Sequence, residues 1–562
     1  MKNTITHPEL EAIRLIPGTP FYDRQQEMNE FLLAWDTDSL LYNFRKAAGL
    51  STGDAEPMTG WDADECKLKG HTTGHYLSGV SLAYAATGDE RFAHKAEAIV
   101  KGLKECQAAF ASSGKTAPGF VSAYDEEQFD LLEVYTKYPE IWAPYYTLDK
   151  IMSGLIDAYE LAGIKEALDV LLPLGDWVYR RLSRLPDDQR TRMWSMYIAG
   201  EYGAMISTMV RLYRISGSED HLKAAKLFEN DKLFGQMADG RDELDTMHAN
   251  QHIPQVMGAL ELFAETGESR YMDIAANFEQ IVTEHHCYSF GGTGEHELFH
   301  AADDECSWLT DSSAESCASY NMLRLTGRLH EFSGSAGLMD YYERTLFNHI
   351  LMSCSHAPDG GTTYFLPTAP GSTKHYETEE NSCCHGTGME SRYRYMTDIY
   401  SFAGDEEGGM LRIELPISSV LRGSESVTVS FTDDGIITVR ADEDMKRRLA
   451  VRIPSWADAE DAGSYRVISD RLRQGDAVTI DLGMNTRKVR IDSDPEYACL
   501  AWGPYLLAAV SEDKEFIKAP GADKLTHADD SGEFVCTCPG CSIRFRPMYR
   551  IDGEAYHIYM KN

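Results

Sequence analysis

The strongest constraint on the fold of this chain is a helix–turn–helix pattern that recurs five times. Each copy has a helix with apolar residues at helical spacing, a turn with glycine, and a second amphipathic helix, as in LAYAATGDERFAHKAEAIV. A glycine directly after the last apolar position is typical of a left-handed cap that ends a helix. The turn glycines are Gly88, Gly163, Gly217, Gly267 and Gly334.

Five such hairpins, with the segments near 25–50 and 386–402 available for a sixth, predict a closed (α/α)6 toroid. The spacings of 75, 54, 50 and 67 residues between the turn glycines leave room for long loops at one rim. An irregular helical domain and an open solenoid are the alternatives. The length of 562 residues fits three to four domains of ordinary size, and fewer if one of them is a toroid.

After about residue 405 the sequence changes to short β-branched or alternating segments. Examples are MLRIELPI, SVTVSF, GIITVRA and AVTIDL, which are separated by turns such as DDG and QGD. They predict an all-β module, most simply a sandwich. We therefore expect a mainly α protein with an all-β C-terminal part, divided into a toroid over 1–405 and a β-sandwich over 406–562. The tail after a polar insertion at 511–540 is expected to form strands that pack back on the helical domain.

The charge and composition exclude several classes of partner. Lys and Arg total 53 and Asp and Glu total 89, so the formal charge is 53 − 89 = −36. So acidic a surface repels nucleic acid and anionic membranes but accepts neutral ligands such as sugars. No run of 18 apolar residues is present, and the N-terminus has neither the basic nor the apolar region of a secretory signal. We therefore expect a cytoplasmic protein, with its 12 cysteines reduced.

Three cysteines and a glutamate are the first candidates for a metal site. Glu315 and Cys317 lie at the start of a predicted helix, and Cys383 and Cys384 lie in the glycine-rich stretch SCCHGTGMES. Three thiolates and a carboxylate are competent ligands for a tetrahedral zinc ion. Their spacing is not that of a CxxC pair, so buried cysteines packed as small apolar residues are the alternative.

A second group of cysteines lies in the sequence CTCPGC within the polar insertion. Its members are Cys536, Cys538 and Cys541. Their spacing is typical of a metal site, but the sequence offers no evident fourth ligand. Structural zinc, a surface disulfide and no special role all stay open for this group.

Histidines and a pair of glutamates are further candidates. His71 and His75 are four residues apart, as in paired helical metal ligands, but the glutamate of HExxH is absent. A hydrogen bond to a polar ligand, or a helix cap, is the simpler interpretation. His248 fits a ligand contact or a core histidine equally well. Glu295 and Glu297 follow a glycine-rich loop, and neighbouring carboxylates suit acid/base work on a glycosidic bond, although such pairs also arise by chance among 89 acidic residues.

An ordered set of segments matches one known family. The segments are GHTTGHYLSGVSLAYAATGD, IWAPYYTLDKIMSGLIDAY, HANQHIPQVMGALELFAETGE, SFGGTGEHELF, ESCASYNMLRLTGRL, YFLPTAPGSTKHY and CCHGTGME, followed by RIPSWA, AWGPYLLAA and RFRPMYRI. Together they resemble the β-L-arabinofuranosidases of glycoside hydrolase family 127 and its close relative, family 146. The resemblance spans about residues 60–560. The ordered set is far more specific than any one of its members.

The resemblance implies an (α/α)6 catalytic barrel followed by a β-sandwich, which agrees with the hairpin count. It also implies a retaining glycosidase whose nucleophile is a zinc-bound cysteine, Cys383 in this sequence. The acid/base glutamate is implied at Glu297, with Glu295 as the second choice. The implied zinc ligands are Glu315, Cys317, Cys383 and Cys384.

The resemblance also implies a set of residues that contact the substrate. One of them departs from the family pattern, because Asp149 stands in YYTLDK where YYTLHK is usual. An ionised Asp offers only hydrogen-bond acceptors, whereas His can donate. This departure bears on the sugar and the linkage more than on the reaction class. The implied substrate-contacting residues are His71, His75, Asp149, Glu201, His248 and Tyr364.

We therefore expect a retaining glycoside hydrolase, a β-L-arabinofuranosidase that acts on plant-derived oligosaccharides through a zinc-bound cysteine. One alternative keeps the fold and mechanism but acts on another furanoside or an unusual branched sugar. Others are a non-catalytic carbohydrate-binding protein with a structural zinc, and a toroid epimerase with histidine bases. The expected partners are an oligosaccharide or glycoside substrate, no nucleic acid and no membrane, with a homodimer as one option for the assembly.

Overall fold

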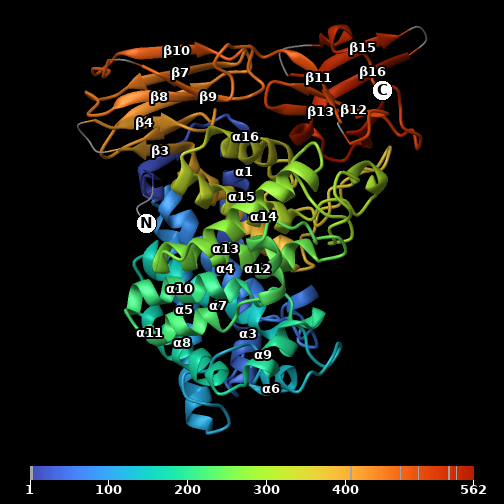
Figure 1. Cartoon of the computed structure of the whole chain (residues 1–562). Coiled ribbons are helices and arrows are strands. Elements are labelled where there is room, and N and C mark those ends of the chain that lie inside the picture. Colours follow the sequence, from blue (N-terminus) through green and yellow to red (C-terminus); the bar gives the residue numbers. More distant parts are fainter. Residues whose placement is uncertain (1–3, 405–407, 469, 492, 529–531, 539–540) are drawn as a thin grey trace.

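A ring of six helices forms the centre of the computed structural model, which describes residues 4–404, 408–468, 470–491, 493–528, 532–538 and 541–562. Each ring helix contacts the next along the chain, and the last contacts the first, so the ring is closed. This arrangement confirms the predicted (α/α)6 toroid, which fills the lower part of Figure 1. The ring helices are α4 (His71–Thr87), α7 (Pro144–Glu160), α10 (Ala204–Ser216), α13 (Ala249–Thr266), α15 (Ser316–Ser333) and α17 (Cys383–Arg394).

All the outer helices of the toroid except the first follow a ring helix through the glycine turns predicted from the sequence. Gly88, Gly217, Gly267 and Gly334 each take a left-handed conformation directly after a ring helix, and Gly163 does so in the turn after α7. The outer helices are α1 (Pro20–Ala34), α5 (Glu90–Ser113), α8 (Ala167–Ser183), α11 (Glu219–Lys226), α14 (Ser269–His285) and α16 (Ala336–Thr345). Shorter helices in the connections are α2 (Thr37–Leu40), α3 (Tyr42–Ala47), α6 (Glu127–Glu133), α9 (Asp187–Trp194) and α12 (Asp231–Ala238).

Glycines let two of the ring helices touch along their backbones. A Cβ on Gly74 of α4 would lie 2.2 Å from the carbonyl carbon of Lys150 in α7, and one on Gly154 would lie 2.6 Å from the carbonyl oxygen of Gly74. Any larger residue would force the helices apart, because real Cβ atoms do not approach other atoms so closely. This close contact fixes the position of α4 relative to α7, which contributes Tyr146 to the candidate site.

Two five-stranded sheets form the predicted β-sandwich, above the toroid in Figure 1. Apolar residues from both sheets, among them Val429 and Ile437 of one and Leu449 and Val451 of the other, belong to one buried cluster. The first sheet has the order β1 (Ile5–Thr6), β3 (Tyr400–Ala403), β4 (Met410–Ile413), β8 (Arg448–Ile453) and β9 (Ser464–Val467), with β4 and β8 parallel. The second has the order β10 (Ala477–Asp481), β7 (Ile436–Ala441), β6 (Val427–Phe431), β5 (Ser419–Leu421) and β2 (Ile13–Leu15).

A third sheet, of eight strands, follows the sandwich and was not separately predicted. Its tail packs back on the helical part, as expected: the Tyr556 hydroxyl donates to the carbonyl of Pro367 at 2.7 Å, and the backbone N–H of Ser289 donates to the Tyr559 hydroxyl at 2.8 Å. The strands are β11 (Thr486–Arg490), β12 (Tyr497–Trp502), β13 (Tyr505–Val510), β14 (Thr526–His527), β15 (Phe534–Cys538), β16 (Cys541–Pro547), β17 (Tyr556–His557) and β18 (Met560–Lys561).

The first strands of the chain lie in the sheets of its later part. β1 pairs with β3, and β2 pairs with β5, so the N-terminal segment belongs structurally with the sandwich although the division between 405 and 406 stays a prediction. In the part of the chain that is described, no helix combines the length and the apolar character needed to cross a membrane. The side chains of Cys538 and Cys541 lie outside the described residues, so the cysteine group of the polar insertion stays a prediction as well.

Candidate active site

The ring helices begin at a common cavity of about 400 Å³. Tyr146 in the first turn of α7 and Glu201 in the turn before α10 both line it. His248 and Glu315, the N-cap residues of α13 and α15, line it as well. The fifth residue is Cys383, the first residue of α17. Helix N-termini carry unpaired N–H groups and a partial positive charge, so a ring of them favours anionic side chains and ligands. A larger groove of about 780 Å³ lies between α14, α16 and the third sheet, and none of the predicted site residues lines it.

Four residues predicted as metal ligands lie together at this cavity, and two of them, Glu315 and Cys383, line it. They offer one ligand atom each, and these atoms all lie within 4.8 Å of one another. Oε1 of Glu315 is 3.6 Å from Sγ of Cys383 and 3.7 Å from Sγ of Cys384. All four side chains are buried. The four are Glu315, Cys317, Cys383 and Cys384.

A bound cation would balance the charges of this cluster. Burial, and then the neighbouring Cys383, raise the pKa of Glu315 and of Cys317 well above their usual values. Oε2 of Glu315 is buried and has no hydrogen-bond partner among the described residues. Four buried groups that repel one another as anions would be satisfied by one divalent ion, and a set of three thiols and one carboxylate matches the ligands of zinc. The cluster can therefore hold a metal ion.

Glu297 lines the same cavity as Cys383. The Tyr364 hydroxyl donates to Oε1 of Glu297, and Sγ of Cys383 lies 3.8 Å from that hydroxyl. Nδ1 of His248 accepts the N–H of Gln251 at 3.2 Å, so Nε2 carries the ring hydrogen and points it at Oε2 of Glu297, 3.3 Å away. Burial alone would raise the pKa of Glu297, but the hydrogen bonds from His248 and Tyr364 lower it.

The backbone around Glu297 is unusual for residues other than glycine. His296 and Glu297 have φ of 44° and 68°, in the left-handed region. Each such residue costs on the order of 1 kcal/mol or more and persists only where its surroundings hold it. Here the backbone carbonyl of Glu297 accepts the N–H of Ala249 at 2.7 Å, at the start of α13. The strained turn thus places the Glu297 carboxylate at the cavity.

Glu295, the second choice for the acid/base residue, does not line the cavity. Its Oε1 accepts the Thr310 hydroxyl at 2.8 Å and lies 2.6 Å from Nδ1 of His296, and its side chain is buried. These contacts hold the carboxylate within the loop that carries Glu297. Of the two candidates, Glu297 therefore has the geometry for acid/base work.

The predicted substrate residues fall into two groups. Glu201, His248 and Tyr364 line the cavity, whereas His71 and His75 are buried behind it and do not line it. Nδ1 of His71 lies 3.0 Å from the carbonyl of Leu68. A neighbouring amide orients Glu201, because Nδ2 of Asn250 donates to its Oε1 at 2.7 Å. Burial raises the pKa of Glu201 to about 8.

Asp149, the departure from the family pattern, also lies off the cavity. It is buried on α7, where Oδ1 accepts the Thr208 hydroxyl at 2.6 Å and Oδ2 pairs with Nζ of Lys150 at 3.1 Å. Both carboxylate oxygens are thus engaged with other side chains. The structure does not bring Asp149 together with Cys383 and Glu297.

Several lining residues were missed in the sequence. Trp61 and Trp142 lie side by side with ring centroids 4.9 Å apart. Tyr146 and the exposed Tyr138 and Tyr197 also line the cavity. Aromatic faces are suited to stacking on the apolar faces of sugars. Trp142 and Tyr146 stand within the segment IWAPYYTLDK, which could have pointed to them. Trp61 and Tyr197 lie in 3-10 helices of three residues each, which are too short to give a periodic signal.

Comparisons with known proteins identify the family and the fold of this chain. No match was found among curated proteins. A family model described as "Beta-L-arabinofuranosidase, GH127 catalytic domain" matches residues 12–396. The solved structure of a GH127 β-arabinofuranosidase superposes with a TM-score of 0.75 at 17% identity, covering 100% of this chain and 98% of that one. A GH127 β-L-arabinofuranosidase from Geobacillus stearothermophilus T6 gives 0.72 at 15% identity, covering 99% of each chain. The structures share the fold, and the family model places the chain in the GH127 β-L-arabinofuranosidase family, so this protein is a glycoside hydrolase of that family.

Proposed function

We propose that this protein is a retaining β-L-arabinofuranosidase that acts on plant-derived oligosaccharides, with Cys383 as nucleophile and Glu297 as acid/base residue. The observation that carries the proposal is that both side chains face one cavity and are linked through the hydroxyl of Tyr364. A nucleophile and a proton donor on the same sugar-sized cavity are the minimum for cleavage with retention.

The metal in this proposal is zinc, held by the four-residue cluster of Glu315, Cys317, Cys383 and Cys384. Its support is the buried set of mutually repelling thiols and the unpartnered Oε2 of Glu315 within the described part of the chain. Thiolate ligands favour zinc over magnesium or calcium. When bound, zinc supplies the positive charge that keeps Cys383 deprotonated at neutral pH.

The two protein groups then divide the reaction between them. The Cys383 thiolate attacks the anomeric carbon while Glu297 gives its proton to the departing oxygen, so that the glycosidic bond breaks and a thioglycoside forms. Glu297 next takes a proton from a water molecule, which displaces the sulfur and returns Cys383 to a thiolate. Two displacements on one carbon give net retention. The hydrogen bonds of His248 and Tyr364 to Glu297 stabilise its carboxylate form, which the second step needs, so the first step draws on the fraction of enzyme in which Glu297 is protonated.

The choice of sugar falls to the residues that line the cavity. A volume of about 400 Å³ is at the small end of ligand sites and suits one sugar unit at the bottom of the cavity. Glu201 and Asn250 offer hydrogen-bonding groups, and Trp61 and Trp142 offer apolar faces. The arabinofuranoside assignment draws on the names of the two GH127 relatives, and Asp149, which lies off the cavity, does not argue against it.

Zinc content and hydrolysis of p-nitrophenyl β-L-arabinofuranoside, measured for wild type and Cys383→Ser, test the proposal. We expect one zinc per wild-type chain, release of nitrophenol, and loss of that release in the variant. Zinc without turnover would keep the metal site but move the search to other furanosides. Turnover that survives in Cys383→Ser would overturn the nucleophile assignment.

A further inference from the structure

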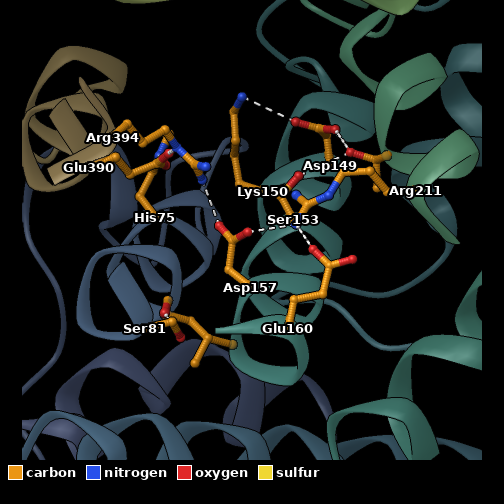
Figure 2. Close-up of polar contacts among 12 residues, drawn as sticks. His75, Ser81, Asp149, Lys150, Ser153, Asp157, Glu160, Arg211, Glu390 and Arg394 are labelled. Atoms are coloured by element: carbon orange, nitrogen blue, oxygen red, sulfur yellow. Dashed lines mark hydrogen bonds and ion pairs between the residues drawn. The ribbon is translucent and has the colours of Figure 1, made fainter. Parts of the chain in front are cut away.

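A chain of hydrogen bonds begins at Tyr146 in the cavity and runs into the axis of the toroid. Nε2 of His75 lies 3.3 Å from the Tyr146 hydroxyl, and Nδ1 of His75 lies 2.7 Å from Oε1 of Glu390. His75 belongs to α4, Tyr146 to α7 and Glu390 to α17, so three ring helices meet at this point. All three side chains are buried. Figure 2 shows His75 directed at Glu390.

Glu390 is held as a carboxylate by the groups on its other side. Oε2 accepts the Tyr320 hydroxyl at 2.5 Å and the Nε hydrogen of Arg394 at 3.1 Å. Burial alone would raise the pKa of Glu390, but Arg394 and the hydrogen bond with His75 lower it well below its usual value. An ionised carboxylate only accepts hydrogen bonds, so its partner on His75 must be a protonated Nδ1.

The series of hydrogen bonds and ion pairs continues from Arg394 through Asp157 and Arg211 to Glu160 (Figure 2). Nη2 of Arg394 pairs with Oδ2 of Asp157 at 2.7 Å, and Oδ1 of Asp157 pairs with Arg211 at 2.8 Å. Arg211 reaches Glu160 at 2.6 Å, and Glu160 is exposed to solvent. Each buried charge thus has an opposite neighbour, and Arg394 and the Tyr320 hydroxyl hold Glu390 in place beside His75.

The same series of hydrogen bonds determines the direction of the Tyr146 hydroxyl hydrogen. With Nδ1 protonated, a neutral His75 has a lone pair on Nε2. Burial lowers the pKa of His75 to about 4, and Lys150 and His71 act in the same direction, so the ring is neutral at physiological pH. A phenol beside an imidazole lone pair donates its hydrogen to it.

We propose that Glu390 and His75 are positioning residues that commit the single hydrogen of Tyr146 to His75, so that Tyr146 offers the cavity only acceptor lone pairs. Tyr146 then selects a sugar whose facing hydroxyl donates a hydrogen bond. A substrate with an ether, a fluorine or a carbonyl oxygen at that position would meet an acceptor and lose the contact. This inference deepens the proposed function and rests on it for the identity of the ligand as a sugar.

The tautomer of His75 can be measured without any substrate. Full-length protein with ¹⁵N-labelled histidine gives long-range ¹H–¹⁵N correlations that distinguish protonated from unprotonated ring nitrogens. Comparison with His75→Gln and with Tyr146→Phe assigns the signal by two independent routes, so one poorly folding variant does not end the experiment. We expect Nδ1 protonated and Nε2 unprotonated. A hydrogen on Nε2, alone or together with Nδ1, would overturn the inference whether or not the protein hydrolyses arabinofuranosides.

The selectivity is measured with p-nitrophenyl β-L-arabinofuranosides in which each ring hydroxyl is replaced in turn by fluorine, which cannot donate. Fluorine also changes the reactivity of the sugar, but equally for every protein variant. We expect one analogue whose penalty in kcat/KM is roughly tenfold larger in wild type than in Tyr146→Phe, as for one hydrogen bond. Equal penalties in the two proteins for every analogue would overturn the inference. If wild type does not hydrolyse the parent glycoside, that result counts against the proposed function and not against this inference. The measured tautomer of His75 would then still test the inference.

Two variants in this series of hydrogen bonds and ion pairs distinguish a positioning role from a purely structural one. Glu390→Gln places an amide beside Nδ1 of His75 and removes the carboxylate that fixes the tautomer. We therefore expect the loss of kcat/KM on the fluorinated analogue to fall from the wild-type value toward that of Tyr146→Phe. Glu160→Gln changes only the exposed end of the chain and should leave both the tautomer and the penalty as in wild type. Lower activity of Glu390→Gln on all analogues alike, with an unchanged penalty, would mean that Glu390 has a structural role only.

Discussion

Glu414 joins the helical ring to the β-sandwich, and its replacement by glutamine should destabilise the protein at neutral pH much more than in acid. The carboxylate is buried at the start of the sandwich. Oε1 accepts the Ser401 hydroxyl at 2.5 Å and lies 3.2 Å from Nε2 of His330 on α15, and Oε2 accepts the Tyr465 hydroxyl at 2.6 Å.

The size of the effect follows from the pKa of Glu414. Burial would raise this pKa, but His330 and the two hydroxyl donors outweigh burial and lower it from 4.5 to about 2. That difference corresponds to about 3 kcal/mol of unfolding free energy. Because the pKa is lower in the folded state, the contribution is fully present above about pH 5 and is lost as the pH falls toward 2.

Urea unfolding of wild type and Glu414→Gln at pH 7 and pH 3 measures this contribution. We expect the variant to lose about 3 kcal/mol at pH 7 and roughly half of that or less at pH 3. The exposed Glu443, also in the sandwich, provides a matched control, since Glu443→Gln should change stability little at either pH. The reasoning would be refuted by an equal loss in Glu414→Gln at both pH values, or by no loss at pH 7.

Three further predictions concern the candidate site. Glu297→Gln should lower kcat/KM by roughly 10²–10⁴-fold for alkyl arabinofuranosides, and by less for the p-nitrophenyl glycoside, whose leaving group needs no proton. Glu295→Gln should keep most of the activity. Similar losses in both variants would contradict Glu297 as the acid/base residue. Asp149→Asn should change KM for the same glycoside less than about threefold but lower the urea midpoint, because a buried lysine loses its partner. Gly386→Ala should destabilise the protein by roughly 1–3 kcal/mol in urea unfolding, because the new Cβ would lie 2.3 Å from the ring of His75.

The helical ring could be predicted from the sequence because its signals are local. Gly88, Gly217, Gly267 and Gly334 cap their helices as the pattern indicated, and the apolar spacing on either side needs no knowledge of distant partners. Strands β1 and β2 could not be predicted, because two or three residues are too few to show alternation. Their partners, β3 and β5, also lie about 400 residues further along the chain.

The residues of the site could be predicted only from motifs and from the family resemblance, because their spacing in the sequence does not show which of them lie together. Glu315 and Cys383 are far apart in sequence and meet because two ring helices begin at the same cavity. Trp61 lines that cavity from a 3-10 helix of three residues, Gly60–Asp62, which is too short to show a periodic pattern. His75 was expected to contact substrate, but the structure places it behind Tyr146, where its partner is Glu390.

Trapping the sugar on the enzyme tests the central claim most directly. Glu297→Gln incubated with p-nitrophenyl β-L-arabinofuranoside should complete the first displacement and stall before the second, because the base for water is missing. Rapid acid quench, digestion and tandem mass spectrometry then locate the sugar. We predict one pentosyl group on Cys383, with the neighbouring Cys384 unmodified. A pentosyl group on a carboxylate such as Glu315 or Glu201, or on Cys384, would contradict Cys383 as the nucleophile.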